Sequence, residues 1–200
     1  LPSAARSALA GYVRDGGVLV AYGSALGSFI SGDDALFATR AETVLGGDPD
    51  GDEAEGSSAP GTAIESIEDY REAINDPTRR PDTLPGALLN TEVDPENFLA
   101  SGYDGMAPTV FADGSLILTP LTLTEGTNVV RYASADRLVA SGYVWDENRR
   151  QMAFKPYMLA QPNGRGLAIG FAHDPSVRGY MDGLDMLLAN AVLVAPARVR

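Results

Sequence analysis

The residues best placed to do chemistry follow a short apolar run near the amino terminus. The run VLVAYGSALGSFI, residues 18–30, breaks into a turn at Gly23–Gly27. A strand-to-helix turn flanked by glycines can hold one side chain out beyond the end of a sheet, as nucleophile elbows do. Its middle position is Ala25, which has no nucleophilic atom, and Ser24 lies one position too early for the Gly-x-Ser-x-Gly pattern. The pattern favours a steric role for the glycines, with an anion cradle at the helix start as the alternative.

A second candidate is the only histidine, His173, in GFAHDPSVRG after another apolar run. A catalytic histidine needs a group to deprotonate, and the chain has no cysteine. A structural role is therefore favoured, and Arg178 and Asp182 lie close enough in sequence to form a polar cluster with it or a simple surface ion pair. A hydrolase using Ser24 with His173 requires their side chains to lie within hydrogen-bond reach, roughly 3 Å.

Acidic residues do not define a metal or glycosidase site. Asp48, Asp50 and Asp52 resemble the start of a calcium loop, but the glycine is misplaced and Ala59 stands where a glutamate ligand is required. One histidine without cysteine does not supply the usual ligands of zinc, so we predict no metal or cofactor in this chain. Pairs for glycoside chemistry arise by chance among 27 acids. The candidates with no distinctive spacing are Asp104, Glu125, Asp146 and Glu147.

The elements that would position these residues begin with a predicted helix over 3–15, capped by Ser3 and ended by Gly16-Gly17. A buried strand, VLVAYG, follows directly. This order is half of a βαβ unit whose first strand is missing. We therefore expect a fragment that lacks upstream strands. A short helix is predicted around 35–44.

The middle of the chain is strongly acidic. Residues 46–76 hold ten acids against one base, a charge of −9 out of the total of −12. Residues 47–62 are also rich in Gly, Pro and Ser and predict a mobile loop. A short helix over 64–74 and a proline-punctuated connector over 77–86 follow.

The second half predicts mostly sheet and then a helix. Pro162-Asn163-Gly164 indicates a hairpin turn between two strands near 153–172. Residues 179–195 carry apolar side chains at helical spacing. The predicted fold class is a single α/β domain of flavodoxin-like or amidotransferase-like type, with a mixed sheet flanked by helices and an antiparallel pair near 153–172. The predicted strands are 87–94, 109–112, 116–118, 129–133, 139–144, 153–160 and 166–172.

Composition excludes several functions. The acidic balance lacks the basic footprint that nucleic acids or anionic membranes require. No apolar run approaches the roughly 18–20 residues of a membrane span, so we predict no membrane insertion. The amino terminus shows no signal peptide. The oligomeric state is left open.

Several segments together resemble a known family. In order, the chain resembles the carboxy-terminal region of large bacterial zinc carboxypeptidase-like proteins, in which a peptidase of the carboxypeptidase A type precedes a class I glutamine amidotransferase-like domain. The resemblance covers nearly the whole chain except the acidic stretch 47–80, which looks like a variable insertion. It rests on LPSAARSALAGYVRDGGVLVAYG, LNTEVDPENFLASGYDG, EGTNVVRYA, LVASGYVWDENRR and AFKPYMLAQPNGRGLAIGFAHDPSVRGYMDGLDMLLANAVL.

The resemblance implies a scaffold without its chemistry. Ala25 matches the amidotransferase cysteine, and His173 roughly matches the histidine, although Asp174 separates it from Pro175. None of the zinc ligands of the peptidase can be carried over, so zinc is expected only in an upstream peptidase domain covalently linked to this one. The family implies a secreted or periplasmic parent.

Two functional hypotheses follow. The favoured one is a non-catalytic accessory domain of a zinc metallocarboxypeptidase, whose active site lies in another domain. The alternative is a module that binds a small molecule, peptide or sugar. Its pocket would lie where strands end, between Gly23–Gly27 and the loop from His173 to Arg178, and would accept a carboxylate or a sugar. The candidate pocket residues are Ser24, Ala25, His173, Arg178 and Asp182.

Overall fold

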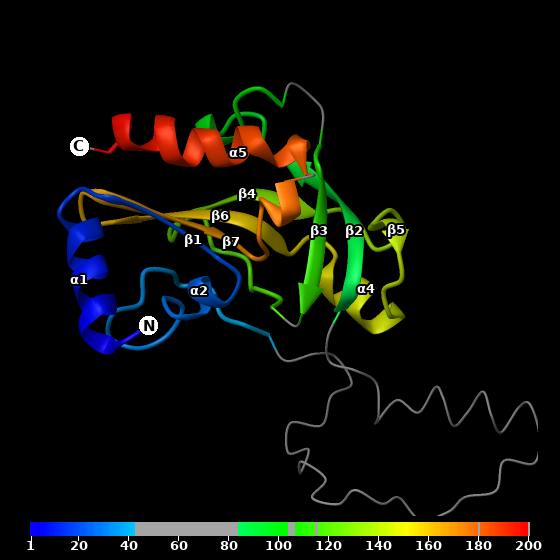
Figure 1. Cartoon of the computed structure of the whole chain (residues 1–200), viewed down its shortest axis with the longest axis horizontal. Helices are drawn as coiled ribbons and strands as arrows, with labels where there is room; N and C mark the ends of the chain where they lie inside the picture. The colour runs from blue at the N-terminus through cyan, green and yellow to red at the C-terminus, as the bar shows by residue number, and fades with distance from the viewer. Residues whose placement is uncertain (43–83, 104–106, 115, 180, 200) are drawn as a thin grey trace, which may run out of the picture.

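The computed structural model describes residues 1–42, 84–103, 107–114, 116–179 and 181–199 (Figure 1). Short 3-10 segments lie between the longer helices and strands, and the described chain ends in a series of short helical segments. The helices are α1 (Ser3–Arg14), α2 (Gly23–Gly27), α4 (Asp146–Met152) and α5 (Asp185–Ala189). The short helical segments are η2 (Phe98–Ala100), η3 (Val177–Gly179), η4 (Asp182–Leu184), η5 (Asn190–Val194) and η6 (Ala195–Ala197). The strands are β1 (Val18–Tyr22), β2 (Leu84–Val93), β3 (Thr109–Gly114), β4 (Thr127–Tyr132), β5 (Val139–Gly142), β6 (Pro156–Asn163) and β7 (Gly166–Phe171).

These strands form one mixed sheet in the order β1-β7-β6-β4-β2-β3, with β5 paired to β2 beside β4. Only the β1–β7 pair is parallel among the described strands, and its register aligns Val18 with Leu167 and Tyr22 with Phe171. The neighbours from β7 to β3 run antiparallel. The two parallel strands therefore end side by side at one edge of the sheet.

Helices cover both faces of the sheet (Figure 1). On one face α1 and α2 lie against β1 and β7, and their buried Ala10, Val13 and Leu26 join one apolar core. On the other face, the run from η4 to η6 buries Leu184, Leu187 and similar residues in a second core. Alternating side chains of the strands supply both cores, so one sheet joins two hydrophobic layers.

The predicted fold class is confirmed, because the chain folds as an α/β domain with a mixed sheet flanked by helices. The predicted antiparallel pair near 153–172 is β6 and β7. Its turn lies slightly later than predicted, at Gly164-Arg165, where Gly164 adopts φ 59°. Because positive φ suits glycine far better than Pro or Asn, the glycine sets the position of the turn.

Three local predictions need correction. Residues 35–42 form no helix, because Leu36 and Phe37 bond back to Phe29 and bury their side chains in the core. Ser3 does not cap α1, since it is already the first helical residue and Pro2 precedes it. Residues 116–118 form only a single bridge, from Leu118 to Ala41, instead of a strand.

The carboxy-terminal helix is also less regular than predicted. It starts at Asp182 and passes through 3-10, α and π segments before ending at Ala197. The predicted acidic loop over 47–62, the helix over 64–74, Asp104 and the candidate calcium residues lie outside the described residues.

Candidate functional site

The parallel pairing of β1 and β7 brings the two predicted site segments together. Tyr22 and Phe171 are register partners at the ends of these strands. The turn at Gly23 and the segment at His173 therefore leave the sheet at the same edge. Ligand sites of open α/β sheets lie beyond such carboxyl ends. A binding site is therefore expected at this edge of the sheet.

A hollow of about 490 Å³ opens at this edge, and we call it the strand-end hollow. The turn after β1 becomes the five-residue helix α2, which starts at Gly23 with φ 53°. The turn after β7 and the end of β3 complete the walls. The lining residues are Tyr22, Gly23, Ser24, Gly27, Asp113, Gly114, Leu116, Ala172, His173 and Asp174.

Asp113 reaches the strand-end hollow because the sheet curls. In strand order β3 is separated from β7 by β6, β4 and β2. Even so, Asp113 Oδ1 lies 3.9 Å from His173 Nδ1. The opposite ends of the sheet therefore approach each other at this site, and an acid from β3 faces the histidine after β7.

His173 is deeply buried, with 3% of its side chain exposed. Burial lowers the pKa of its imidazole to about 4, and the Asp113 carboxylate together with a hydrogen bond to the Asp113 backbone offsets only part of that effect. The ring is therefore neutral at pH 7. A neutral imidazole carries one N–H donor and one bare nitrogen acceptor.

The Nε2 atom of His173 is unusual because it is both buried and unpaired. His173 Nε2 is buried and has no hydrogen-bond partner in the structure. Since Nδ1 faces Asp113, a proton on Nδ1 leaves Nε2 as an acceptor. A buried polar atom without a partner costs about 1–3 kcal/mol of folding free energy.

Of the predicted site residues, the structure brings Ser24 and His173 to the same hollow. His173 Nε2 accepts no hydrogen bond from Ser24 in this structure. Ala25, Arg178 and Asp182 are exposed and do not line the hollow. Arg178 adopts φ 51° at a kink in η3, and it forms no polar cluster with His173 in the described structure.

The sequence pattern placed the loop from His173 to Arg178, and so Asp174, at the pocket, but it did not indicate the lining residues Tyr22, Asp113, Gly114, Leu116 and Ala172. Tyr22 and Ala172 adjoin Gly23 and His173, so their position at the ends of strands was a usable signal. Asp113 had no such signal, because its approach to His173 depends on the curl of the sheet.

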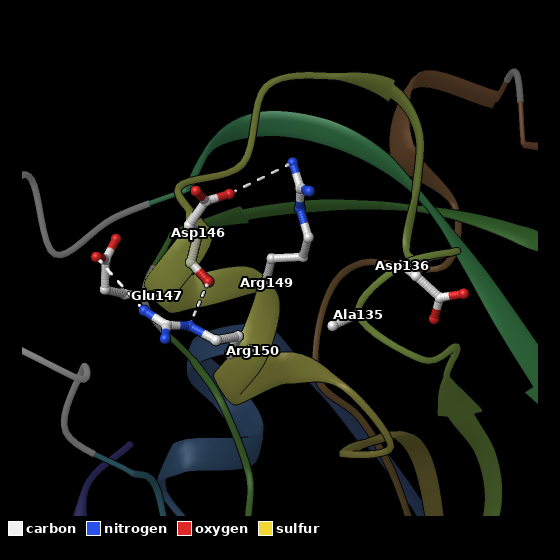
Figure 2. Close-up of a pocket in the computed structure, with 6 residues that line it drawn as sticks. All are labelled: Ala135, Asp136, Asp146, Glu147, Arg149 and Arg150. Atoms are coloured by element: carbon white, nitrogen blue, oxygen red, sulfur yellow. Dashed lines mark hydrogen bonds and ion pairs between the residues drawn. The ribbon is translucent and has the colours of Figure 1, made fainter.

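A second hollow of about 420 Å³ lies beside α4 (Figure 2). Its charges are largely paired within the helix. Arg149 Nη2 lies 3.7 Å from Asp146 Oδ1, and Arg150 Nη2 lies 3.7 Å from Glu147 Oε1. Figure 2 shows Asp136 apart from these pairs, on a neighbouring segment. Such exposed pairs at i,i+3 are ordinary helix stabilisers, so Asp146 and Glu147 do not stand out as an acid–base pair.

Among the described residues, no group of three or more His, Asp or Glu side chains could hold a metal ion. Within the same part of the chain, every helix is too short or too polar to cross a membrane. The fold and site thus define an α/β domain with a mixed sheet and a hollow at the ends of its parallel strands. Comparisons with known proteins found no matching family model, no similar curated protein and no similar solved structure.

Proposed function

We propose that this chain is a non-catalytic accessory domain that binds a small molecule in the strand-end hollow. One observation carries the proposal: an open hollow lies at the ends of two parallel strands, lined by the glycine turn after one strand and by the buried His173 after the other. Ligands of open α/β sheets bind in such crevices beyond the carboxyl ends of the strands.

Binding accounts for the site better than catalysis does. Ala25 offers only a methyl group at the middle of the turn. Ser24 does not donate to His173, and a histidine with a pKa of about 4 is a weak base at neutral pH. The site therefore lacks an activated nucleophile.

The family resemblance supplies the context of this proposal. A scaffold with Ala25 in the nucleophile position fits a domain appended to a zinc carboxypeptidase-like parent, exported from the cell, in which the peptidase domain does the chemistry. Binding in the strand-end hollow would then serve the parent's substrate or product. Sequencing the gene region upstream of Leu1 tests this context separately from ligand binding.

The binding proposal is tested by screening amino acids, dipeptides and sugars for a rise in melting temperature. Two exposed neighbours provide matched variants, because Ser24 lines the hollow and Ala25 does not. We expect Ser24→Phe to abolish the effect of any ligand found and Ala25→Phe to preserve it. A flat response across the panel, or equal loss in both variants, would contradict the proposal.

The absence of catalysis has its own assay. Purified protein, supplied with zinc, is incubated with carboxypeptidase and glutaminase substrates, and we expect turnover equal to the blank. Turnover above the blank that disappears in Ser24→Ala or His173→Gln would show that the chain is an enzyme.

A further inference from the structure

The strand β1 ends the sheet on one side and leaves an open edge. Among the described strands, β7 alone pairs with it. The Leu167 amide donates to the Gly17 carbonyl, and a strand in a parallel pair uses alternate residues to bond its neighbour. Gly17 and every second residue after it therefore face β7. The backbone groups of Val18 and Val20 and the amide of Tyr22 point to the open edge.

Nothing in β1 protects this edge from pairing. Natural edge strands are usually blunted by a charge, a proline or a bulge. The sequence of β1, VLVAY, has neither a charge nor a proline, and its register with β7 is regular from Val18 to Tyr22. A row of free backbone groups on such a strand is a template for another strand.

Exposed apolar side chains border β1 on both faces of the sheet. On one face α1 packs against β1, and the ring of Tyr12, more than half exposed, lies against Gly17 just before the strand. On the other face η5 packs against β1 and exposes Val192 and Leu193. Figure 1 shows α1 and the carboxy-terminal helical run on opposite faces of the sheet. A strand added beside β1 would thus meet apolar side chains on both faces.

We propose that β1 pairs antiparallel with β1 of a second copy of this chain, about a twofold axis at Val20. The edge is uncharged and apolar on both flanks, so it fits an equally uncharged and apolar strand, and β1 is itself such a strand. A twofold interface must also be self-complementary. The outward groups meet this condition, because they are evenly placed about Val20. No like charges are opposed in this register.

The hydrogen bonds of this pairing follow from its register. Val20 exchanges both of its backbone bonds with Val20 of the other copy. The Tyr22 amide of each copy donates to the Val18 carbonyl of the other. The two sheets thereby become one continuous sheet across the dimer.

Sedimentation velocity over a concentration series tests whether the chain dimerises. We expect a monomer–dimer equilibrium with a Kd of about 1–100 μM. Val20→Pro removes an outward N–H and no bond to β7, so it should raise the Kd at least about tenfold. Leu193→Lys should also weaken the dimer. Its matched control is Leu123→Lys, at an exposed leucine before β4, which β7 and β6 separate from β1, and this variant should leave the Kd unchanged.

Cysteine cross-linking tests the register with substitutions that change little volume. The chain has no cysteine, so a single introduced cysteine can form a disulfide only with the other copy. The Cα atoms of Val20 and its copy would lie about 5.5 Å apart, within the range of a disulfide. Those of Val18 and its copy would lie about 13 Å apart. With a mild oxidant, we expect Val20→Cys to give a covalent dimer on a non-reducing gel and Val18→Cys to stay monomeric.

Three outcomes would overturn the inference. They are a monomer at every concentration, an unchanged Kd in a folded Val20→Pro variant, and equal cross-linking of the two cysteine variants. In the first case the open edge of β1 would be left to a strand of a different chain.

Discussion

At the scale of single residues, His173 governs the site because its environment decides its protonation. A solvent-exposed histidine would be half charged near pH 6.5, whereas burial lowers the pKa of this one to about 4. The neutral imidazole therefore keeps one nitrogen as a hydrogen-bond acceptor.

The first prediction concerns pH. Below about pH 6.5 the unfolded chain binds a proton at His173, but the folded chain does not until about pH 4. The unfolded state therefore gains protons first, and the free energy of unfolding falls as the pH falls through this window. Between pH 7.5 and 4.5 the wild type should lose about 2–3 kcal/mol more than His173→Gln.

Urea unfolding of both proteins at the two pH values measures this difference. Subtracting the variant removes the contribution of the carboxylates, which both proteins share. Equal losses in the two proteins would show that His173 titrates normally in the folded state.

A second prediction concerns Glu92, which joins two strands of the sheet. It accepts hydrogen bonds from Arg131 on β4 and from Arg137, and these bonds, led by Arg131, lower the pKa of its carboxyl. Both arginines are more than half exposed, so solvent screens the attraction. Glu92→Gln should reduce the free energy of unfolding by less than about 1 kcal/mol. Thermal unfolding at low and at high salt checks this, and a cost that persists unchanged at high salt would speak against an electrostatic origin.

At the scale of elements, the contact of α1 with the β6–β7 hairpin depends on glycine. Hydrogen bonds run from Arg165 and Leu167 to the carbonyls of Arg14 and Gly17, so the helix end and the hairpin lie backbone to backbone. A Cβ at Gly166 would overlap the carbonyl oxygens of Val13 and Gly17. Rotating a side chain cannot relieve this overlap, because the overlapping atoms belong to the backbone.

We therefore predict that Gly166→Ala lowers the free energy of unfolding by about 1–3 kcal/mol. Gly11→Ala in α1 is the matched control, since no atom lies within 4 Å of its added Cβ. It should raise stability by about 0.5–1 kcal/mol through helix propensity. Chemical denaturation of the two variants measures both effects, and a neutral Gly166→Ala would disprove the close packing.

At the scale of the whole molecule, one sheet separates two cores that must form together. Leu26 is fully buried on the α2 side and Leu187 on the α5 side. Because β7 contributes side chains to both cores, losing either layer weakens the same strand. The described chain should unfold as a single cooperative unit.

Leu26→Ala and Leu187→Ala should each cost about 2–5 kcal/mol. Far-UV circular dichroism and the fluorescence of the sole tryptophan, Trp145, should give coincident transitions in both variants. Leu123→Ala serves as the control, because Leu123 is fully exposed and its loss should change stability by less than about 0.5 kcal/mol. Separate transitions from the two probes would show that the cores unfold independently.

Local sequence patterns predicted most of the helices and strands, and the incorrect predictions have physical causes. The strands from β2 to β7 follow apolar runs bounded by turn residues. Helix α4 was missed because DENRRQM shows little apolar periodicity, although its acidic first turn and basic last turn matched the helix dipole. The helix predicted around 35–44 failed because Leu36 and Phe37 gain more from burial in the core than from helical bonds.

The sequence by itself determined the α/β class, the antiparallel hairpin of β6 and β7, and the methyl group of Ala25 at the middle of the turn. These depend on residue identity and on contacts between near neighbours. Only the tertiary structure decided that Asp113 meets His173, that Nε2 has no partner, and that Arg178 and Asp182 lie apart from the site. Such features arise from the curl of a sheet whose end strands are far apart in the chain, and no local pattern encodes that curl.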